Sequence, residues 1–393
     1  MPETITHVSF SRAGGAGSVA RILSEEQRRQ GRNSRLISVI GSDLRAAPLS
    51  SPLHTIAAGL DEYLIKKRNF PSPISALRDL VSGIRIKDLS SSDVIHLHGI
   101  NGALGLEELQ AVPKDTRVIW TLHDMNPFTG TCHYSLGCDG FKVACSACPA
   151  VKSVFSRAVS DLLTRKKDAV AKISNLTVVS PSQWLADEAR QSVVFRSHPI
   201  TVIPNPIDPI FLDEKRPGTI GDNPGLLRVI VVAKNLSDPV KQVGFAVRAF
   251  RSAFPRAGDA TLTLVGSGGT EFESGDVALT GPLSKPDLAR IFASSDILIV
   301  PSKGENAPLV IGEAAANGCL PLVASVGGMG EMVSAIQHGA VFENFEELTH
   351  CLIKFGQVEA STRRRTREEI RARARRLYSP SAAVKEYDKV YST

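Results

Sequence analysis

The chain has 393 residues, a length typical of two or three domains, and 42% of them are hydrophobic, enough for sizeable buried cores. Its net charge of +6 suits an anionic small ligand or an anionic membrane surface, and no basic helix or aromatic motif of the kind that binds nucleic acid accompanies it. No apolar run reaches the ~20 residues needed to span a bilayer, and the first residues lack the pattern of a signal peptide. We therefore expect a cytoplasmic protein, either free or peripheral at the inner face of the cell membrane, with no nucleic-acid partner.

Short apolar runs alternate with helical segments through the first half of the chain. A strand over residues 7–10 leads into a glycine turn and a helix from Gly14 to Gln30. Ser182 is a suitable N-cap for a helix from Gln183 to Arg190. Strand–helix alternation is typical of a parallel sheet covered by helices on both faces. The further strands expected in this half span residues 36–40, 93–98, 118–122, 176–179 and 200–203.

The segment Pro204-Asn205-Pro206 interrupts this pattern, because proline cannot continue a central strand. The alternation then restarts, so the predicted fold class is α/β, with two Rossmann-like doubly wound domains facing a cleft. We expect a first domain over residues 1–205, a second over 206–378, and a C-terminal helix over 379–393 that crosses back onto the first domain. In the second domain, strands are expected over 229–233, 262–265, 296–300 and 320–324, and helices over 244–253, 285–293 and 308–317.

Three basic segments each admit two interpretations. Residues 362–378 include eight arginines from Arg363 to Arg376, a pattern that favours a solvated amphipathic helix over contact with anionic lipid headgroups. Residues 63–70 and 157–172 mix basic and apolar side chains, which favours ordinary surface helices over docking of a lipid-linked molecule.

Glycines and histidines follow the predicted strands of the first domain at their carboxyl ends. Gly14 and Gly15 stand in the first turn, where glycine lets backbone amides approach a phosphate or a sugar. The turn has neither the dinucleotide-binding glycine spacing nor a Walker lysine, so an ordinary tight turn is an equal alternative. His98 and His123 each stand at the carboxyl end of a strand, which favours a ligand-facing role over two buried structural histidines.

Four of the six cysteines fall within one loop over residues 130–150. In a reducing compartment such a cluster is a thiol or metal site rather than a disulfide framework. Four thiolates would satisfy a tetrahedral structural zinc, although the two longer spacings are irregular for a zinc ribbon, so packed reduced thiols are an equal alternative. The four are Cys132, Cys138, Cys145 and Cys148.

The strongest motif follows the buried-strand pattern of residues 296–300. Glu305 stands on the loop that leaves the strand, where open α/β sheets bind ligands. Pro308 suits the start of a helix, and the free amides of that first turn suit a phosphate. Glu313, separated from Glu305 by seven residues, lies within the helix. Two further candidates, Lys234 and Lys241, follow the first strand of the second domain, where a cation could bind a phosphate as a point charge.

This arrangement resembles the Glu-x7-Glu signature of retaining glycosyltransferases that use nucleotide sugars, family 4 in particular. Pro301-Ser302 before the pair, Gly318 after it and the run from Gly327 to Glu331 match the same family. The stretch from His123 to Tyr134 is similar to a polysaccharide-assembly subgroup of the exopolysaccharide and colanic-acid type. The resemblance covers nearly the whole chain and implies the GT-B architecture, with the first domain on the acceptor side and the second binding the nucleotide sugar.

The resemblance also implies roles for individual residues. Glu313 would hold the ribose hydroxyls, and Lys241, with Lys234 as a weaker second cation, would offset the diphosphate charge. Glu305 would lie near the sugar and its anomeric carbon as nucleophile, charge stabiliser or orienter, and His123, the stronger of the two histidine candidates, would lie near the transferred sugar. The other implied donor contacts are Gly14, Gly15, Leu283, Ala307, Pro308, Leu309 and Val310.

The expected function is retaining transfer of a hexosyl group from a nucleotide-diphosphate sugar to a glycan or lipid-linked acceptor in cell-surface polysaccharide assembly. No metal-binding Asp-x-Asp motif is present, so catalysis is expected to need no metal ion or other cofactor. A nucleotide-sugar epimerase or phosphorylase on the same fold, and a catalytically silent binding or scaffold protein, are the alternatives.

Overall fold

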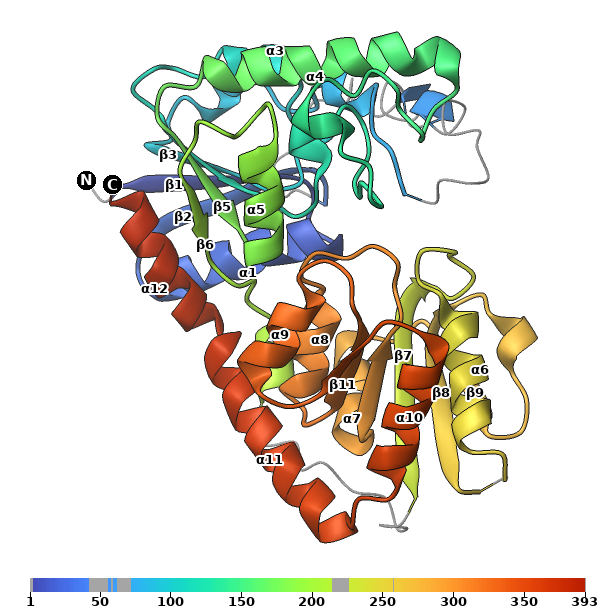
Figure 1. Cartoon of the computed structure of the whole chain (residues 1–393). Coiled ribbons are helices and arrows are strands. Elements are labelled where there is room, and N and C mark those ends of the chain that lie inside the picture. The colour runs from blue at the N-terminus through green and yellow to red at the C-terminus, as the bar shows by residue number, and fades with distance from the viewer. Residues whose placement is uncertain are drawn as a thin grey trace. The chain divides into compact units, whose positions relative to one another are not determined.

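The computed structural model describes residues 3–41, 56–57, 59–61, 72–213, 226–256 and 258–392. The chain divides into two compact units, Met1–Pro206 with Ala383–Thr393, and Ile207–Ala382. Each unit has one six-stranded sheet whose paired strands are all parallel (Figure 1). The basic segment 63–70 lies outside the described residues.

The sheet of the first unit has the order β2-β1-β3-β4-β5-β6. The chain places β2 on one side of β1, and β3 and the later strands on the other side, so the strand order reverses between β1 and β3. In open parallel sheets, ligands bind at the carboxyl ends of the strands beside such a reversal. The loops that follow β1 and β3 are therefore the ones that border a binding crevice. The strands are β1 (Thr4–Ser11), β2 (Asn33–Ile40), β3 (Val94–Leu97), β4 (Arg117–Thr121), β5 (Leu176–Ser180) and β6 (Ile200–Val202).

Four α-helices of this unit have their bounds within the described residues and precede the C-terminal one. Ser182 caps α5 by accepting a hydrogen bond from the Leu185 amide at 3.1 Å, which confirms the predicted N-cap. Helix α1 approaches β1 so closely that a Cβ atom on Gly17 would lie 2.0 Å from the Ser11 carbonyl oxygen. Gly17 therefore serves packing, whereas a Cβ on Gly15 would meet nothing within 4 Å. The helices are α1 (Gly14–Arg29), α3 (Leu106–Gln110), α4 (Ser156–Ala171) and α5 (Gln183–Gln191).

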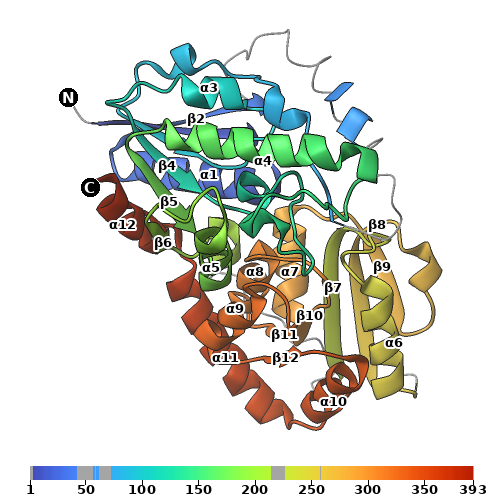
Figure 2. The ribbon, with the colours of Figure 1, turned by 45° about the horizontal axis from the view of Figure 1, so that its top comes forward.

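The sheet of the second unit has the order β12-β11-β10-β7-β8-β9 (Figure 2). Here the direction reverses between β7 and β10, the arrangement of the dinucleotide-binding fold. Two short edge strands, β9 and β12, were not predicted, because neither has a continuous buried apolar run. The strands are β7 (Leu227–Asn235), β8 (Ala260–Ser267), β9 (Val277–Gly281), β10 (Ile297–Val300), β11 (Leu320–Ala324) and β12 (Ala340–Phe342).

In the described part of the second unit, six α-helices accompany this sheet. Helix α10 packs on α6, and α8 packs on α7, α9 and α11. None of the helices in the described ranges is both long and apolar enough to cross a membrane. The six are α6 (Val243–Ala253), α7 (Lys285–Ser294), α8 (Leu309–Ala315), α9 (Met329–Ile336), α10 (Phe345–Gly356) and α11 (Ala360–Leu377).

The arginine-rich helix α11 is not the uniformly solvated helix that the sequence favours. Arg367 is buried and donates to the carbonyl oxygens of Ala293, at 2.7 Å, and Ser295. One and two turns further on, Arg371 and Arg375 donate to the carbonyls of Asn317 at 3.2 Å and Ala316 at 3.1 Å. Because the last carbonyls of a helix have no partner within it, this arginine face caps the carboxyl ends of α7 and α8.

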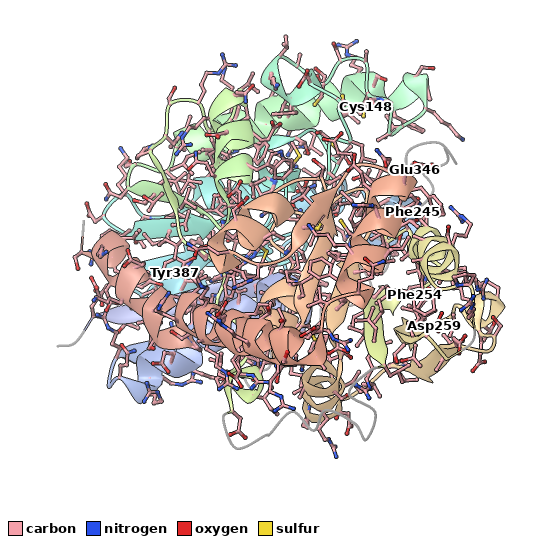
Figure 3. The ribbon with its side chains drawn as sticks, turned by 60° about the horizontal axis from the view of Figure 1, so that its bottom comes forward. Cys148, Phe245, Phe254, Asp259, Glu346 and Tyr387 are labelled. Carbon is pink, nitrogen blue, oxygen red and sulfur yellow. The ribbon has the colours of Figure 1, made fainter. Side chains whose placement is uncertain are left out.

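The last helix, α12 (Pro380–Tyr391), contributes its residues from Ala383 onward to the first unit. Tyr387, labelled in Figure 3, is buried, and its hydroxyl lies 2.8 Å from the Thr121 hydroxyl on β4. The Tyr391 hydroxyl accepts a hydrogen bond from the Gln27 amide of α1 at 3.1 Å. These contacts confirm that the C-terminal helix packs back onto the first part of the chain.

Candidate functional site

The loops that follow β7 and β10 meet at the reversal point of the second sheet. The backbone amide of Lys303 donates to the Val240 carbonyl at 2.8 Å, which ties the two loops together. Within the first loop, Asp238 accepts from the Val240 amide at 2.8 Å through its side chain and from the Lys241 amide at 3.0 Å through its carbonyl. These turns fix the backbone from which Lys241 extends.

Lys241 and Glu305, predicted from two separate motifs, form an ion pair between Nζ and Oε1. The Glu305 side chain is 11% exposed and that of Lys241 30% exposed. The structure therefore places a cation and a carboxylate side by side, partly shielded from water, where open parallel sheets bind ligands. Such a pair can oppose charge on a bound phosphate and at the same time hold a hydroxyl.

Helix α8 starts directly after this loop. Pro308 is its N-cap residue, one position before the first helical residue, Leu309. Ala307, Pro308, Leu309 and Val310 are all half-buried. The predicted start of the helix at 308 is thus correct to within one residue, and its first amides lie next to Glu305 along the chain.

Glu313 lies on the same helix, two turns beyond Glu305 along the chain. Burial raises the pKa of its carboxyl from 4.5 to about 7, with the neighbouring Lys285 acting in the opposite direction and Asp208 reinforcing the rise. Lys285 and Asp208 are themselves an ion pair, 2.7 Å between Nζ and Oδ2. The Glu313 carboxyl is therefore set to change its charge near neutral pH.

The two remaining donor candidates of this unit lie less centrally. Lys234 is exposed near the end of β7, where its carbonyl accepts from the Ser267 hydroxyl at 2.7 Å. Leu283 is half-buried and follows β9, two strands away from β7 in the sheet order. Lys234 thus lies at the carboxyl end of β7, the strand that precedes Lys241, whereas Leu283 follows β9 at the edge of the sheet.

In the first unit, the predicted residues lie at the ends of neighbouring strands. Gly14 and Gly15 are exposed at the start of α1, after β1. The two histidines are in contact, with 3.1 Å between Nδ1 of His98 and Nε2 of His123. Burial lowers the pKa of His123 to about 4, against a small opposite effect of Asp124, so its imidazole is neutral at neutral pH.

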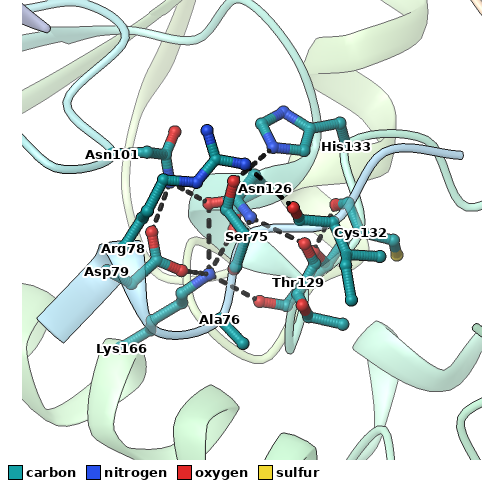
Figure 4. A network of polar contacts seen from close by, with 12 residues as sticks. Ser75, Ala76, Arg78, Asp79, Asn101, Asn126, Thr129, Cys132, His133 and Lys166 are labelled. Atoms are coloured by element: carbon teal, nitrogen blue, oxygen red, sulfur yellow. Dashed lines mark hydrogen bonds and ion pairs between the residues drawn. The ribbon is translucent and has the colours of Figure 1, made fainter. Parts of the chain in front are cut away.

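A buried polar network that the sequence did not predict holds the loop after β4 (Figure 4). Lys166 of α4, 4% exposed, pairs with Asp79 at 2.7 Å and donates to the Asn126 carbonyl at 2.7 Å and the Thr129 carbonyl at 3.1 Å. The interpretation of residues 157–172 as an ordinary surface helix is therefore wrong for Lys166. Helical spacing could have shown that Lys166 is buried, because buried residues lie three or four positions away on either side, at Leu162, Leu163, Ala169 and Val170.

The second anchor of this loop is an acid–histidine pair. Asp124 accepts from the Asn126 amide at 2.9 Å and pairs with Nδ1 of His133 at 2.7 Å. Nε2 of His133 in turn lies 2.9 Å from the Ser75 hydroxyl. The structure thus joins the segment after His123 to the start of the cysteine loop and to the 72–79 segment.

The four cysteines of the loop line one small cavity of about 20 Å³. Cys132 and Cys145 are buried, and burial raises the pKa of the Cys145 thiol to about 11. Burial also raises the pKa of the Cys148 thiol, while the backbone amides of Gly130 near Cys145 and of Ala150 and Val151 near Cys148 act against the rise. The sulfur atoms of the four cysteines do not form a group of possible metal ligands in the part of the chain that the structure describes. Such a group, with its ligand atoms all within 4.8 Å of one another, is formed there by His7, His96 and His98.

The comparisons with known proteins agree with this geometry. The Glycosyltransferase Family 4 profile matches residues 13–211, and the Glycosyl transferases group 1 profile matches residues 227–356. A protein of Escherichia coli (strain K12), named as a colanic acid biosynthesis glycosyl transferase, WcaC, is 25% identical over 294 residues, which cover 72% of this chain and 70% of that one.

Two solved structures show the fold. Sucrose-phosphate synthase from Thermosynechococcus elongatus superimposes with a TM-score of 0.62 at 16% identity, covering 99% of this chain and 98% of that one. WaaG, a glycosyltransferase involved in lipopolysaccharide biosynthesis, does so with a TM-score of 0.61 at 15% identity, covering 97% and 99%. The predicted GT-B fold, with two Rossmann-like units, is confirmed. The chain belongs to glycosyltransferase family 4 and is a glycosyltransferase.

Proposed function

We propose that this enzyme transfers a hexosyl group from a nucleotide-diphosphate sugar to a glycan or lipid-linked acceptor, with retention of configuration, in the assembly of a cell-surface polysaccharide. The observation that supports it most is the Lys241–Glu305 pair at the reversal point of the second sheet. The name of the colanic acid relative supports the polysaccharide context.

In this proposal the second unit binds the donor. Lys241 offsets the charge that builds up on the leaving diphosphate, with Lys234 as a second cation, and Glu305 holds a sugar hydroxyl near the anomeric carbon. Glu313 binds the ribose hydroxyls. The start of α8, from Ala307 to Val310, offers amides to the phosphates, and Leu283 contacts the base through its backbone.

The first unit binds the acceptor. Gly14 and Gly15 touch the donor diphosphate from the first loop, and His123 lies against the transferred sugar. The leaving phosphate takes the proton of the acceptor hydroxyl, so the reaction uses protein groups and substrate alone, with no metal ion. The enzyme works in the cytoplasm, and the exposed arginines of α11 support a peripheral contact with anionic lipid; these are Arg364, Arg365 and Arg376.

The test is a panel of UDP-, GDP- and dTDP-sugars incubated with the purified protein, read by release of nucleoside diphosphate. Glu305→Gln and Lys241→Ala are expected to reduce release from the one donor that reacts. Glu346→Gln and Lys354→Ala, exposed on α10, are matched controls of the same residue types. A sugar phosphate formed without acceptor would favour a phosphorylase instead. The proposal would be refuted if no donor released its nucleoside diphosphate and calorimetry also detected no nucleotide binding.

The proposal also includes a structural zinc ion in the cysteine loop. The arrangement of the four cysteines around one small cavity supports it, because four thiolates satisfy a tetrahedral zinc ion. Their sulfur atoms do not form a metal-ligand group in the described structure, so zinc binding would require these side chains to move closer together. Elemental analysis of the purified protein is expected to find one zinc per chain, lost in Cys148→Ser and kept in Cys351→Ser, and a metal-free native protein that takes up no zinc would overturn this part.

A further inference from the structure

Buried histidines form a continuous chain of contacts behind His123. Nδ1 of His7 lies 3.0 Å from Nε2 of His98, and Nδ1 of His98 lies 3.1 Å from Nε2 of His123. At the other end, Nε2 of His7 lies 2.8 Å from Oε1 of Gln27 on α1. His7 is 0% exposed, His98 2% and Gln27 0%, so no bulk water competes for these contacts.

A bound metal would have to break this chain. The ligand atoms of His7, His96 and His98 lie within 4.8 Å of one another, but every ring nitrogen of the three already has a polar partner. Those of His96 are the Tyr391 hydroxyl at 2.7 Å and the Thr121 hydroxyl at 2.8 Å. The cluster is therefore a hydrogen-bond network, and the partners of each ring determine which of its two nitrogens carries the proton.

The rings of the chain are neutral. Burial lowers the pKa of His7 and of His123 to about 4 and lowers that of His98 well below its ordinary 6.5. A neutral imidazole has one N–H donor and one lone-pair acceptor on its two nitrogens. Each ring in the chain must therefore donate through one nitrogen and accept through the other.

Gln27 sets the direction of the chain. Its amide nitrogen donates to the Tyr391 hydroxyl at 3.1 Å, and its Oε1 accepts from the Ser34 hydroxyl at 2.7 Å. Because Oε1 can only accept, the proton of His7 is on Nε2, and its Nδ1 accepts from His98. We propose that Gln27, His7 and His98 are positioning residues that hold His123 in the tautomer with its proton on Nε2 and with Nδ1 as a hydrogen-bond acceptor.

The inference about the tautomer stands on the contacts and on the neutral state of the buried rings, and its meaning for catalysis rests on the proposed function. If His123 faces the transferred sugar, the chain makes its Nδ1 accept a hydrogen bond from a hydroxyl group rather than donate one. Tyr391 takes part by holding the Gln27 amide, so the C-terminal helix contributes to the orientation of a proposed active-site ring.

The experiment is NMR of protein with ¹⁵N-labelled histidine, with the His123 ring assigned by its loss in His123→Gln. The wild-type spectrum at neutral pH is expected to show a pyrrole-type Nε2 and a pyridine-type Nδ1 for His123, and the same pattern for His7 and His98. A proton on Nδ1 of His123, or a charged ring, would overturn the inference. Because the wild-type spectrum is recorded without substrate, it decides the tautomer even if the proposed transferase reaction fails.

A pair of variants of similar size tests the link to activity. In His98→Asn the new amide oxygen takes the place of Nδ1 and still accepts from His123, whereas His98→Leu offers no acceptor. We expect the Nε2–H tautomer to persist in His98→Asn and to mix with the other tautomer in His98→Leu, with kcat/KM about two- to tenfold lower in the leucine variant, as for the loss of one hydrogen bond. Equal tautomer ratios in the two variants would refute the role of His98.

Discussion

Glu313→Gln is expected to remove a pH dependence from the stability of the second unit. The folded carboxyl has a pKa of about 7 because it is buried, compared with an ordinary value of 4.5. Between these two values the folded state holds a proton that the unfolded state has lost, so stability falls as the pH rises from 4.5 to 7 and is constant above that window. The difference of about 2.5 pH units, at 1.36 kcal/mol per unit, gives at most about 3.4 kcal/mol, an upper bound because the side chain is only half-buried.

The assay must follow the second unit itself. The chain has two tryptophans, Trp120 and Trp184, and both belong to the first unit, so their fluorescence does not follow α8. Hydrogen exchange of α8 peptides between pH 5 and pH 8, corrected for the intrinsic exchange rate, measures the free energy of opening directly. The opening free energy of wild type is expected to fall over this range, and that of Glu313→Gln to stay level.

The control is Glu346→Gln, which removes an exposed carboxyl of the same unit and should retain the wild-type pH dependence. If wild type and Glu313→Gln lost stability equally between pH 5 and pH 8, Glu313 would titrate in its ordinary range, and the account of its burial would be wrong. The same coupling predicts that a nucleotide whose ribose binds the ionised carboxylate drives proton release, which calorimetry in two buffers of different ionisation enthalpy would detect.

Three further predictions concern packing. Gly17→Ala should cost about 3 kcal/mol in chemical denaturation followed by tryptophan fluorescence, because its Cβ would overlap the Ser11 carbonyl, whereas Gly15→Ala should leave stability unchanged. Arg367→Met should cost about 2–4 kcal/mol in hydrogen exchange of α7, because it leaves buried carbonyls without a donor, and an equal loss in the exposed Arg364→Met would contradict that explanation. Tyr391→Phe should cost about 1–2 kcal/mol by the same fluorescence assay, and an unchanged midpoint would show that its hydroxyl contacts contribute nothing.

The alternating pattern of strands and helices predicted the fold well, because buried parallel strands are continuous apolar runs. Residues 296–300 illustrate this, since all four residues of β10 are buried. The pattern failed where burial is partial or the element is short, as in β9 and β12. A three-residue edge strand has no period from which to predict it.

The candidate site was predicted only as far as local motifs reach. The loop positions of Lys241 and Glu305 followed from the strands before them, and their contact then required only that β7 and β10 be neighbours. Helical spacing could have shown that Lys166 is buried, but the partners of Lys166 and His7 could not be predicted, because they come from distant segments: Asp79 for the lysine, and Gln27 and His98 for the histidine. A polar residue on an apolar face indicates a buried partner but does not identify it.

The position of Tyr391 has a consequence for how the protein is made. Its hydroxyl contacts Gln27, which is 364 positions earlier in the chain, so the hydrophobic core of the first unit is complete only when the last helix has been synthesised. Until α12 has left the ribosome, the histidines on β1 and β3 lack this cover, and the nascent first unit is held in a less stable intermediate. Removal of α12 would therefore disturb the unit formed by the N-terminal half of the chain rather than the unit that immediately precedes α12 in the sequence.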